Sequence, residues 1–246
     1  KVFVGIKPKS GLAITTSVKD FIRDVLNKYN VGSITPEFVD IDYIFPVMAI
    51  TVNYDSRLTN KTQSVLKRDV TSSITTFSTT DLQEFSKELR ISKLSRSIDD
   101  TNTAIVGNEI STKLKKSFNP TLNEKLNYTI NFSNEIHHPH AGHLGAITST
   151  EFTILDGENI SRSGCKFDDK DGIIRIFRIV DGNKQIVYEN QGTVDYDKGE
   201  ILLSLFDPTA YVGSSLDIIV NPQNQDVQPL REQVVLISES NVNITM

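Results

Sequence analysis

The chain of 246 residues contains one cysteine and no tryptophan. The lone Cys165 cannot form an internal disulfide, which excludes a disulfide-stabilised scaffold and any zinc site that needs several cysteines. No stretch approaches the roughly 18 apolar residues that a membrane-spanning helix needs, and no signal-peptide pattern opens the sequence. Basic residues are also scarce, because 26 Lys and Arg face 31 Asp and Glu, for a net charge of −5. These absences favour a globular protein that has neither nucleic acid nor a membrane as its partner.

Histidine is confined to one short segment. All four histidines lie within seven residues, as His137, His138, His140 and His143. With Glu135 beside them they offer up to five metal ligands, and His138 and His140 can chelate one ion when the backbone is extended. However, Pro139 and two glycines indicate a loop, whereas a tight metal site draws its ligands from several rigid elements. We therefore expect a connector loop without a metal, and keep a metal-dependent hydrolase as the less favoured alternative.

Other patterns that carry chemistry are weaker. The acidic run from Asp168 to Gly172 has the carboxylates of a calcium loop but not the spacing of an EF-hand, so we expect a solvated turn. Cys165 has no histidine outside the cluster to activate it, and the sequence contains no phosphate loop or nucleophile elbow. Four cations at intervals of three, Lys87, Arg90, Lys93 and Arg96, fit one helical face that is either solvated or bound to an acidic protein. The sequence thus predicts no catalytic residue, no cofactor-binding residue, no metal ligand and no enzymatic activity.

The first 118 residues alternate between helical and strand patterns. A strand is expected over residues 1–6, and apolar residues at helical spacing predict helices over 17–29 and 60–77. The stripes are Val18, Phe21, Ile22, Val25, Leu26 and Tyr29 in the first helix, and Leu66, Val70, Ile74 and Phe77 in the second. Alternation predicts strands over 37–43 and 47–54, which Pro46 divides into a broken strand or hairpin instead of one central strand. A weaker helix is expected within 82–98.

From residue 119 the pattern is almost wholly β. Strand patterns flank the turns Asp181-Gly182 and Asp197-Lys198-Gly199, which predicts two hairpins. Short strands at this spacing favour a sandwich or an open barrel. We therefore predict an α+β fold, in which a small helix-on-sheet domain over residues 1–118 precedes a mainly antiparallel, sandwich-like β domain over residues 119–246.

Several segments resemble proteins of contractile phage tails. Lys1–Pro8, the helix over 17–29, and Pro36–Asp42 leading into Ile50–Asp55 resemble the baseplate J-like family, in which a helix precedes a proline, aromatic, valine and strand signature. Gly192–Ile201 and Pro229–Ile237 look like the C-terminal region of the large baseplate wedge proteins of T-even-type phages. The resemblance implies that this chain is the C-terminal part of a longer protein, which agrees with a first residue, Lys1, that is not an initiator methionine.

The resemblance also implies a function. It implies a structural subunit of the baseplate wedge in the virion tail, assembled in the host cytoplasm. Its expected partners are a second copy of the chain, in a dimer that extends into a ring, together with other wedge proteins and the sheath initiator. It brings no catalytic residue and no cofactor. An alternative from a different class is a secreted β-sandwich binding module or adhesin, which the strands and the Asn-x-Ser/Thr sequons suggest and the absence of Trp opposes.

Overall fold

A computed structural model describes residues 2–9, 11–29, 36–138 and 145–246. The elements up to residue 118 are β1 (Val2–Gly5), α1 (Thr16–Tyr29), β2 (Pro36–Val39), β3 (Asp42–Tyr54), a 3-10 turn η1 (Ser56–Leu58), α2 (Gln63–Phe77), a π-helical turn η2 (Ser78–Leu82), α3 (Ile91–Asp99) and β4 (Ile105–Phe118). The later elements are β5 (Leu126–Asn131), β6 (Ile147–Ser149), β7 (Phe152–Leu155), β8 (Ser161–Lys170), β9 (Ile173–Val180), β10 (Asn183–Asp195), β11 (Glu200–Phe206), β12 (Ala210–Tyr211), β13 (Leu216–Val220), β14 (Gln233–Val235), a 3-10 turn η3 (Glu239–Asn241) and β15 (Val242–Thr245). The predicted α+β fold is confirmed.

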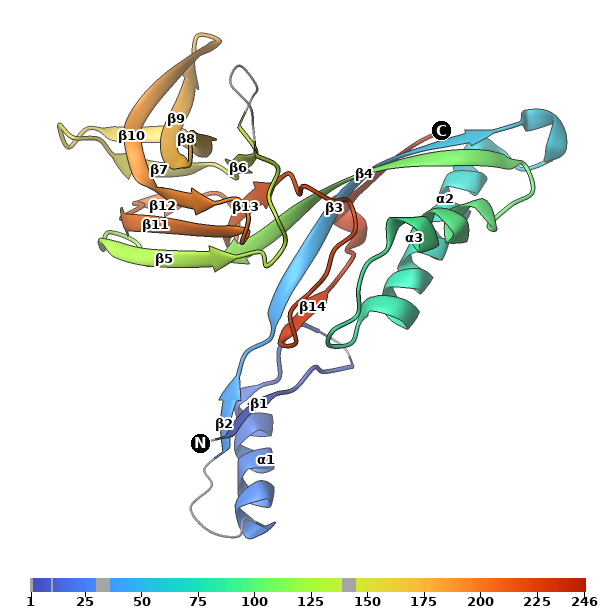
Figure 1. Cartoon of the computed structure of the whole chain (residues 1–246), viewed down its shortest axis with the longest axis horizontal. Helices are drawn as coiled ribbons and strands as arrows, with labels where there is room; N and C mark the ends of the chain where they lie inside the picture. The colour runs from blue at the N-terminus through green and yellow to red at the C-terminus, as the bar shows by residue number, and fades with distance from the viewer. Residues whose placement is uncertain (1, 10, 30–35, 139–144) are drawn as a thin grey trace.

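The first 39 residues form a small unit that hangs from the rest of the chain (Figure 1). Its strands β1 and β2 pair in parallel, with Val2 opposite Pro36 and Gly5 opposite Val39. The helix α1 is the crossover between them, as a parallel pair requires. We call residues 2–39 the N-terminal unit.

A central sheet follows, with strand order β14-β3-β4-β13-β6 and with β15 also paired to β3. The helices α2 and α3 lie against it (Figure 1). The predicted stripe of α2 is confirmed, since Leu66, Val70, Ile74 and Phe77 are its buried residues. Val70, Ile74 and Phe77 belong to the same buried cluster as Met48 and Ile50 of β3. Burial of this face stabilises a helix whose Thr- and Ser-rich polar face has a low intrinsic propensity.

The strand β3 runs unbroken through Pro46, so the predicted break or hairpin is wrong. It is an inner strand, with β4 on one side and β14 and β15 on the other. The backbone groups of Ile44 point toward the β14 and β15 side of β3, because the Ile44 carbonyl accepts from the amide of Leu236 at 3.0 Å. The backbone of Pro46, two residues further along the strand, points to the same side. There β14 pairs only with residues 42–44, and β15 only with 48–51. The missing N–H of Pro46 therefore falls in the gap between two short strands, where no ladder bond is lost.

A seven-stranded sheet of order β12-β7-β8-β9-β10-β11-β5 curls into a half-barrel, which fits the expected open barrel. Its core contains Phe152, Phe167 and Phe206, whose ring centroids lie 4.8 to 5.2 Å apart. Both predicted hairpins are present as β9–β10 and β10–β11. In the second turn Gly199 has a φ of +67°, and a Cβ built there meets the carbonyl oxygen of Asn134 at 2.0 Å. Only glycine fits that close approach.

Strands from the end of the chain return to the central sheet. β13 pairs with β4, while β14 and β15 pair with β3. The buried cluster runs from β3 and α2 through β13 into the half-barrel. The division into residues 1–118 and 119–246 stays a prediction. The strands β13, β14 and β15, which come after residue 119, pair with β3 and β4, which come before it.

Candidate functional site

The N-terminal unit has almost no core of its own. Among its described residues Pro36 alone is buried, and none of the residues of α1 is. A unit of about 40 residues buries too little surface to be stable by itself without further staples. Its apolar side chains therefore remain exposed to solvent unless a surface outside the described chain packs against them.

The apolar stripe of α1 turns largely away from its own sheet. Partial burial marks the side that faces β1 and β2, where Lys19, Ile22 and Arg23 lie. The five remaining members of the stripe are exposed, Leu26 among them. Four of the five follow at spacings of three and four along the adjoining side of the helix: Val18, Phe21, Val25 and Tyr29. Phe21 is 69% exposed and Tyr29 is 81% exposed, and we call these four residues the α1 apolar face. A periodic apolar stripe of this kind marks an interaction surface when it lacks a partner within the fold.

Polar contacts hold α1 on its sheet. Lys19 Nζ lies 2.6 Å from Asp40 Oδ1, and the guanidinium of Arg23 lies over the ring of Phe38 at 5.6 Å from its centroid. Exposed ion pairs are worth at most about 1 kcal/mol, and an exposed cation–π contact is worth a similar amount. These contacts orient the helix without covering its apolar side.

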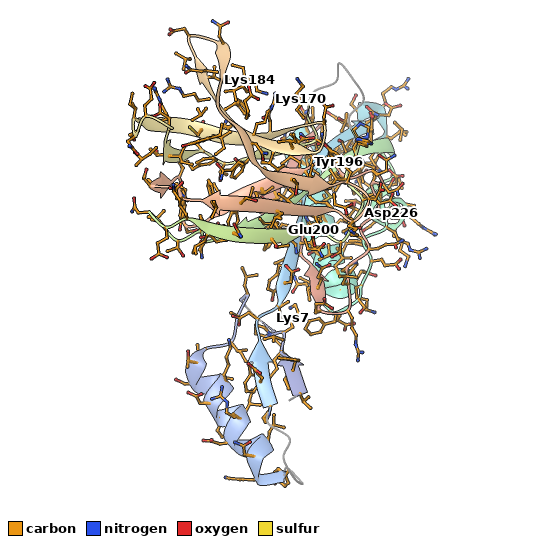
Figure 2. All side chains as sticks on the ribbon, turned by 60° about the vertical axis from the view of Figure 1, so that its left-hand side comes forward. Lys7, Lys170, Lys184, Tyr196, Glu200 and Asp226 are labelled. Carbon is orange, nitrogen blue, oxygen red and sulfur yellow. The ribbon has the colours of Figure 1, made fainter. Side chains whose placement is uncertain are left out.

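Few contacts join the N-terminal unit to the rest of the chain. Tyr43 Oη donates to the carbonyl of Leu12 at 2.9 Å, and Lys7 Nζ donates to Gln83 Oε1 at 3.3 Å. Figure 2 shows Lys7 at this junction, between the N-terminal unit and the sheet above it. The α1 apolar face is thus presented on a slender connection, away from the central sheet and the half-barrel (Figure 1).

The described part of the histidine segment has separate packing partners. The backbone amide of His137 donates to the carbonyl of Asn221 at 2.8 Å, and His137 Nδ1 lies 3.2 Å from Gln223 Oε1. His138 stacks on Tyr196, with ring centroids 4.6 Å apart.

His140 and His143 lie outside the described residues. Within the described ranges, no three His, Cys, Asp or Glu side chains gather as metal ligands. The expectation that the loop holds no metal therefore stays a prediction.

The acidic run differs from the expected solvated turn. Only Asp171 and Gly172 form the turn, whereas Asp168 and Asp169 lie within strand β8, which ends at Lys170, and both side chains are buried. Asp169 accepts from the amide of Ile147 at 2.8 Å and from Tyr196 Oη at 2.7 Å. Donors inside the fold thus occupy this carboxylate, as burial of a charge requires.

Asp168 is the centre of an ion cluster. Its carboxylate is 2.6 Å from Arg175 Nη2 and also contacts Lys184 Nζ. The hydrogen bond to Asp168 raises the pKa of Arg175 above its ordinary value. The sequence did not predict this cluster, because Lys184 is on β10 and Asp168 is on β8, two strands away, and the sequence pattern does not specify the sheet twist that brings them together.

Cys165 is fully buried. Burial raises the pKa of the Cys165 thiol to about 11, so the thiol is protonated at neutral pH.

The basic segment does not form the expected helical face. The helix α3 begins only at Ile91, so Lys87 and Arg90 precede it and the four cations do not share one helical face. Three of them are in ion pairs: Lys87 with Glu84 at 3.3 Å, Arg90 with Glu88 at 2.9 Å and Arg96 with Asp100 at 3.6 Å.

Comparison with known proteins points to one family. Residues 42–117 match "Baseplate structural protein gp6, C-terminal domain III", and residues 1–39 match "Baseplate structural protein gp6, C-terminal domain I". The first half of this chain is similar to the C-terminal part of a phage baseplate wedge protein. This confirms the resemblance to baseplate wedge proteins that the sequence indicated.

A curated relative, also a gp6 protein, shows modest sequence identity to this chain. "Baseplate wedge protein gp6" of Enterobacteria phage T4 is 27% identical over 112 residues, which is 46% of this chain and 17% of the relative. The match therefore spans less than a fifth of the length of gp6. The two gp6 domains correspond to the N-terminal unit and to the part of the central sheet and its helices that lies within residues 42–117.

None of the helices in the described ranges combines the length and the apolar character that crossing a membrane requires.

Proposed function

We propose that the chain is a structural subunit of a contractile-tail baseplate in the phage virion, assembled in the host cytoplasm. The observation that carries the proposal is the match of residues 1–39 and 42–117 to two gp6 C-terminal domains, both described as parts of a baseplate structural protein. The N-terminal unit supports it independently, because its apolar helix face lacks a cover among the described residues, as in a subunit that is completed by assembly.

The α1 apolar face gives the proposed assembly a location. A second copy of the chain covers this face in our proposal, since two identical apolar patches complement each other across a two-fold axis. A dimer becomes a ring only when a second, different interface joins one dimer to the next. The second interface links neighbouring wedges, and other wedge proteins and the sheath initiator bind beside it.

The proposed role requires no chemistry. The family matched is described as structural. Two groups with possible chemistry are engaged in the fold, since the Cys165 thiol is protonated and the carboxylate of Asp169, from the calcium-like acidic run, accepts two internal hydrogen bonds. These surroundings favour a non-enzymatic subunit without a cofactor.

Complementation tests the proposal. Phage carrying a nonsense mutation in this gene are grown with plasmid-borne wild-type chain, Phe21→Asp or Val212→Asp, and tails are examined by negative-stain electron microscopy. Val212 is a matched control, because it is 65% exposed but directly follows the half-barrel's short strand β12, far from α1 in the sequence. We expect complete baseplates with the wild type and Val212→Asp, and tails without baseplates with Phe21→Asp. Normal baseplates in the absence of any complementing chain would contradict the proposal.

A further inference from the structure

The hairpin β9–β10 extends beyond the half-barrel as an arm (Figure 1). β8 pairs with β9 only as far as Phe177, and β11 pairs with β10 only from Gly192 onward. Residues 178–185 are therefore paired only with one another in the described chain. The tip is a tight turn in which Asp181 and Gly182 both have positive φ, as a two-residue hairpin turn requires. We call residues 178–185 the arm.

One side of this hairpin is apolar and basic. Strand register places paired residues on the same face, which puts Lys166 beside Phe177, Lys170 beside Ile173, and Lys184 beside Ile179. These six residues, on the outside of the half-barrel, are defined here as the arm face. The opposite side of β9 carries Ile174 and Ile176, which are fully buried in the core.

The arm face exposes apolar groups that the fold does not use. Ile179, near the tip, is 59% exposed, and Ile173 is exposed as well. Lys170 is exposed and has no ion pair in the part of the chain that the structure describes. Figure 2 shows Lys184 by the projecting hairpin and Lys170 nearer its base, where Lys170 pairs with Ile173.

The local charge is opposite in sign to that of the chain. Residues 161–186 contain six Lys and Arg against four Asp, although the whole chain has a net charge of −5. Two of those four carboxylates, Asp168 and Asp169, are buried. Four of the six cations are in ion pairs, Arg162 with Asp156, Lys166 with Glu151, and Arg175 and Lys184 with Asp168. On the arm face itself three lysines accompany one carboxylate, the buried Asp168 that shares this face of β8, so the arm face is positive.

The arm is also held in one geometry. Lys184 contacts the carboxylate of Asp168 and lies 4.2 Å from the ring centroid of Phe177, and on the other face Arg178 Nε donates to Gln185 Oε1 at 2.9 Å. A braced arm loses little conformational entropy on binding, so the exposed isoleucines and lysines of the arm face contribute more fully to affinity.

We propose that the arm face docks on an acidic protein surface of a different baseplate component, where carboxylates surround an apolar depression that receives Ile179. The proposal rests on the proposed function. Charge complementarity selects the occupant, because two copies of a positive arm face repel each other across a two-fold contact. Nucleic acid is disfavoured, because the exposed apolar groups are isoleucines and not aromatic rings on which bases stack.

Site-directed photocrosslinking in assembled tails tests the proposal. The full chain carries the photoreactive residue benzoylphenylalanine in place of Ile179, or in place of Val212 as the control of similar exposure. Tails are purified and irradiated, and the crosslinked peptides are identified by mass spectrometry. We expect position 179, and not position 212, to crosslink to an Asp- and Glu-rich segment of a different protein of the tail.

A charge variant separates recognition from folding. Lys170 is exposed and has no ion pair among the described residues, so we expect Lys170→Glu to leave the fold unchanged and to lower the yield of the position-179 crosslink roughly threefold or more. Lys170→Arg should keep the wild-type yield. A crosslink only to a second copy, to this same chain or to nucleic acid overturns the proposal, as does a yield no higher than at Val212. Absence of the chain from purified tails overturns the proposed function as well, which distinguishes the two failures.

Discussion

Replacement of Phe21 by aspartate tests whether the α1 apolar face is an interface. Phe21 is 69% exposed, so roughly 100–170 Å² of a side chain that buries 150–250 Å² is still open to water. At about 25 cal/mol per Å², covering this area contributes about 2.5–4 kcal/mol per copy. A two-fold contact contains the residue twice. Even if only about 3 kcal/mol is lost in total, the dissociation constant rises by about 100-fold.

The effect on folding is expected to be small. Exposed substitutions usually change the free energy of unfolding by at most about 0.5 kcal/mol. For a chain of this size that corresponds to about 1–2 °C in the melting temperature. The perturbation therefore separates association from stability.

Sedimentation equilibrium over a concentration series is the assay, with thermal circular dichroism on the same samples. We expect a concentration-dependent dimer for the wild type and for Val212→Asp, and a monomer for Phe21→Asp at the same concentrations. A wild-type chain that stays monomeric at all concentrations, or a Phe21→Asp chain that associates normally, would refute the reasoning.

Three further predictions concern the fold. Gly199→Ala should lower the free energy of unfolding in urea by about 2–4 kcal/mol, because its Cβ collides with the carbonyl of Asn134, whereas Gly182→Ala, which meets open space, should cost about 1 kcal/mol; equal losses would contradict this. Native Cys165, with its pKa raised to about 11, should react with a thiol reagent at pH 8 about 100-fold more slowly than in denaturant, and fast native labelling would show that the thiol is accessible. The amide of Ile160, with other donors, lowers the pKa of Asp156. The stability that this carboxylate contributes is therefore complete above about pH 4 and is lost as the pH falls below that. Asp156→Asn should flatten the acid limb of a plot of unfolding free energy against pH, and an unchanged acid limb would be evidence against the contact.

The parts of the fold that depend on local pattern were predictable. The buried stripe of α2 and the two hairpin turns follow from spacing and turn chemistry, and each is present as expected. The course of β3 was not, because the effect of Pro46 depends on where β14 and β15 stop, and those strands lie almost 200 residues further along the chain. Long-range pairing decided the outcome where a local rule indicated a break.

The candidate site shows the same limit. The stripe of α1 is visible in the sequence, but the pattern states only that one side of the helix is apolar and not what covers it. That Phe21 and Tyr29 face away from β1 and β2 emerged only from the structure. Similarly, the acidic run was seen, but the burial of Asp168 depends on Lys184 reaching across from the arm. A projecting, basic arm leaves no sequence signal beyond an ordinary hairpin.

Cryo-electron microscopy of the intact tail is the most direct test of the structural role. The account predicts density at the baseplate that fits this chain, with the α1 apolar face covered by a second copy and repeated around the tail axis. Purified, complete tails whose baseplate density leaves no place for the chain would contradict it.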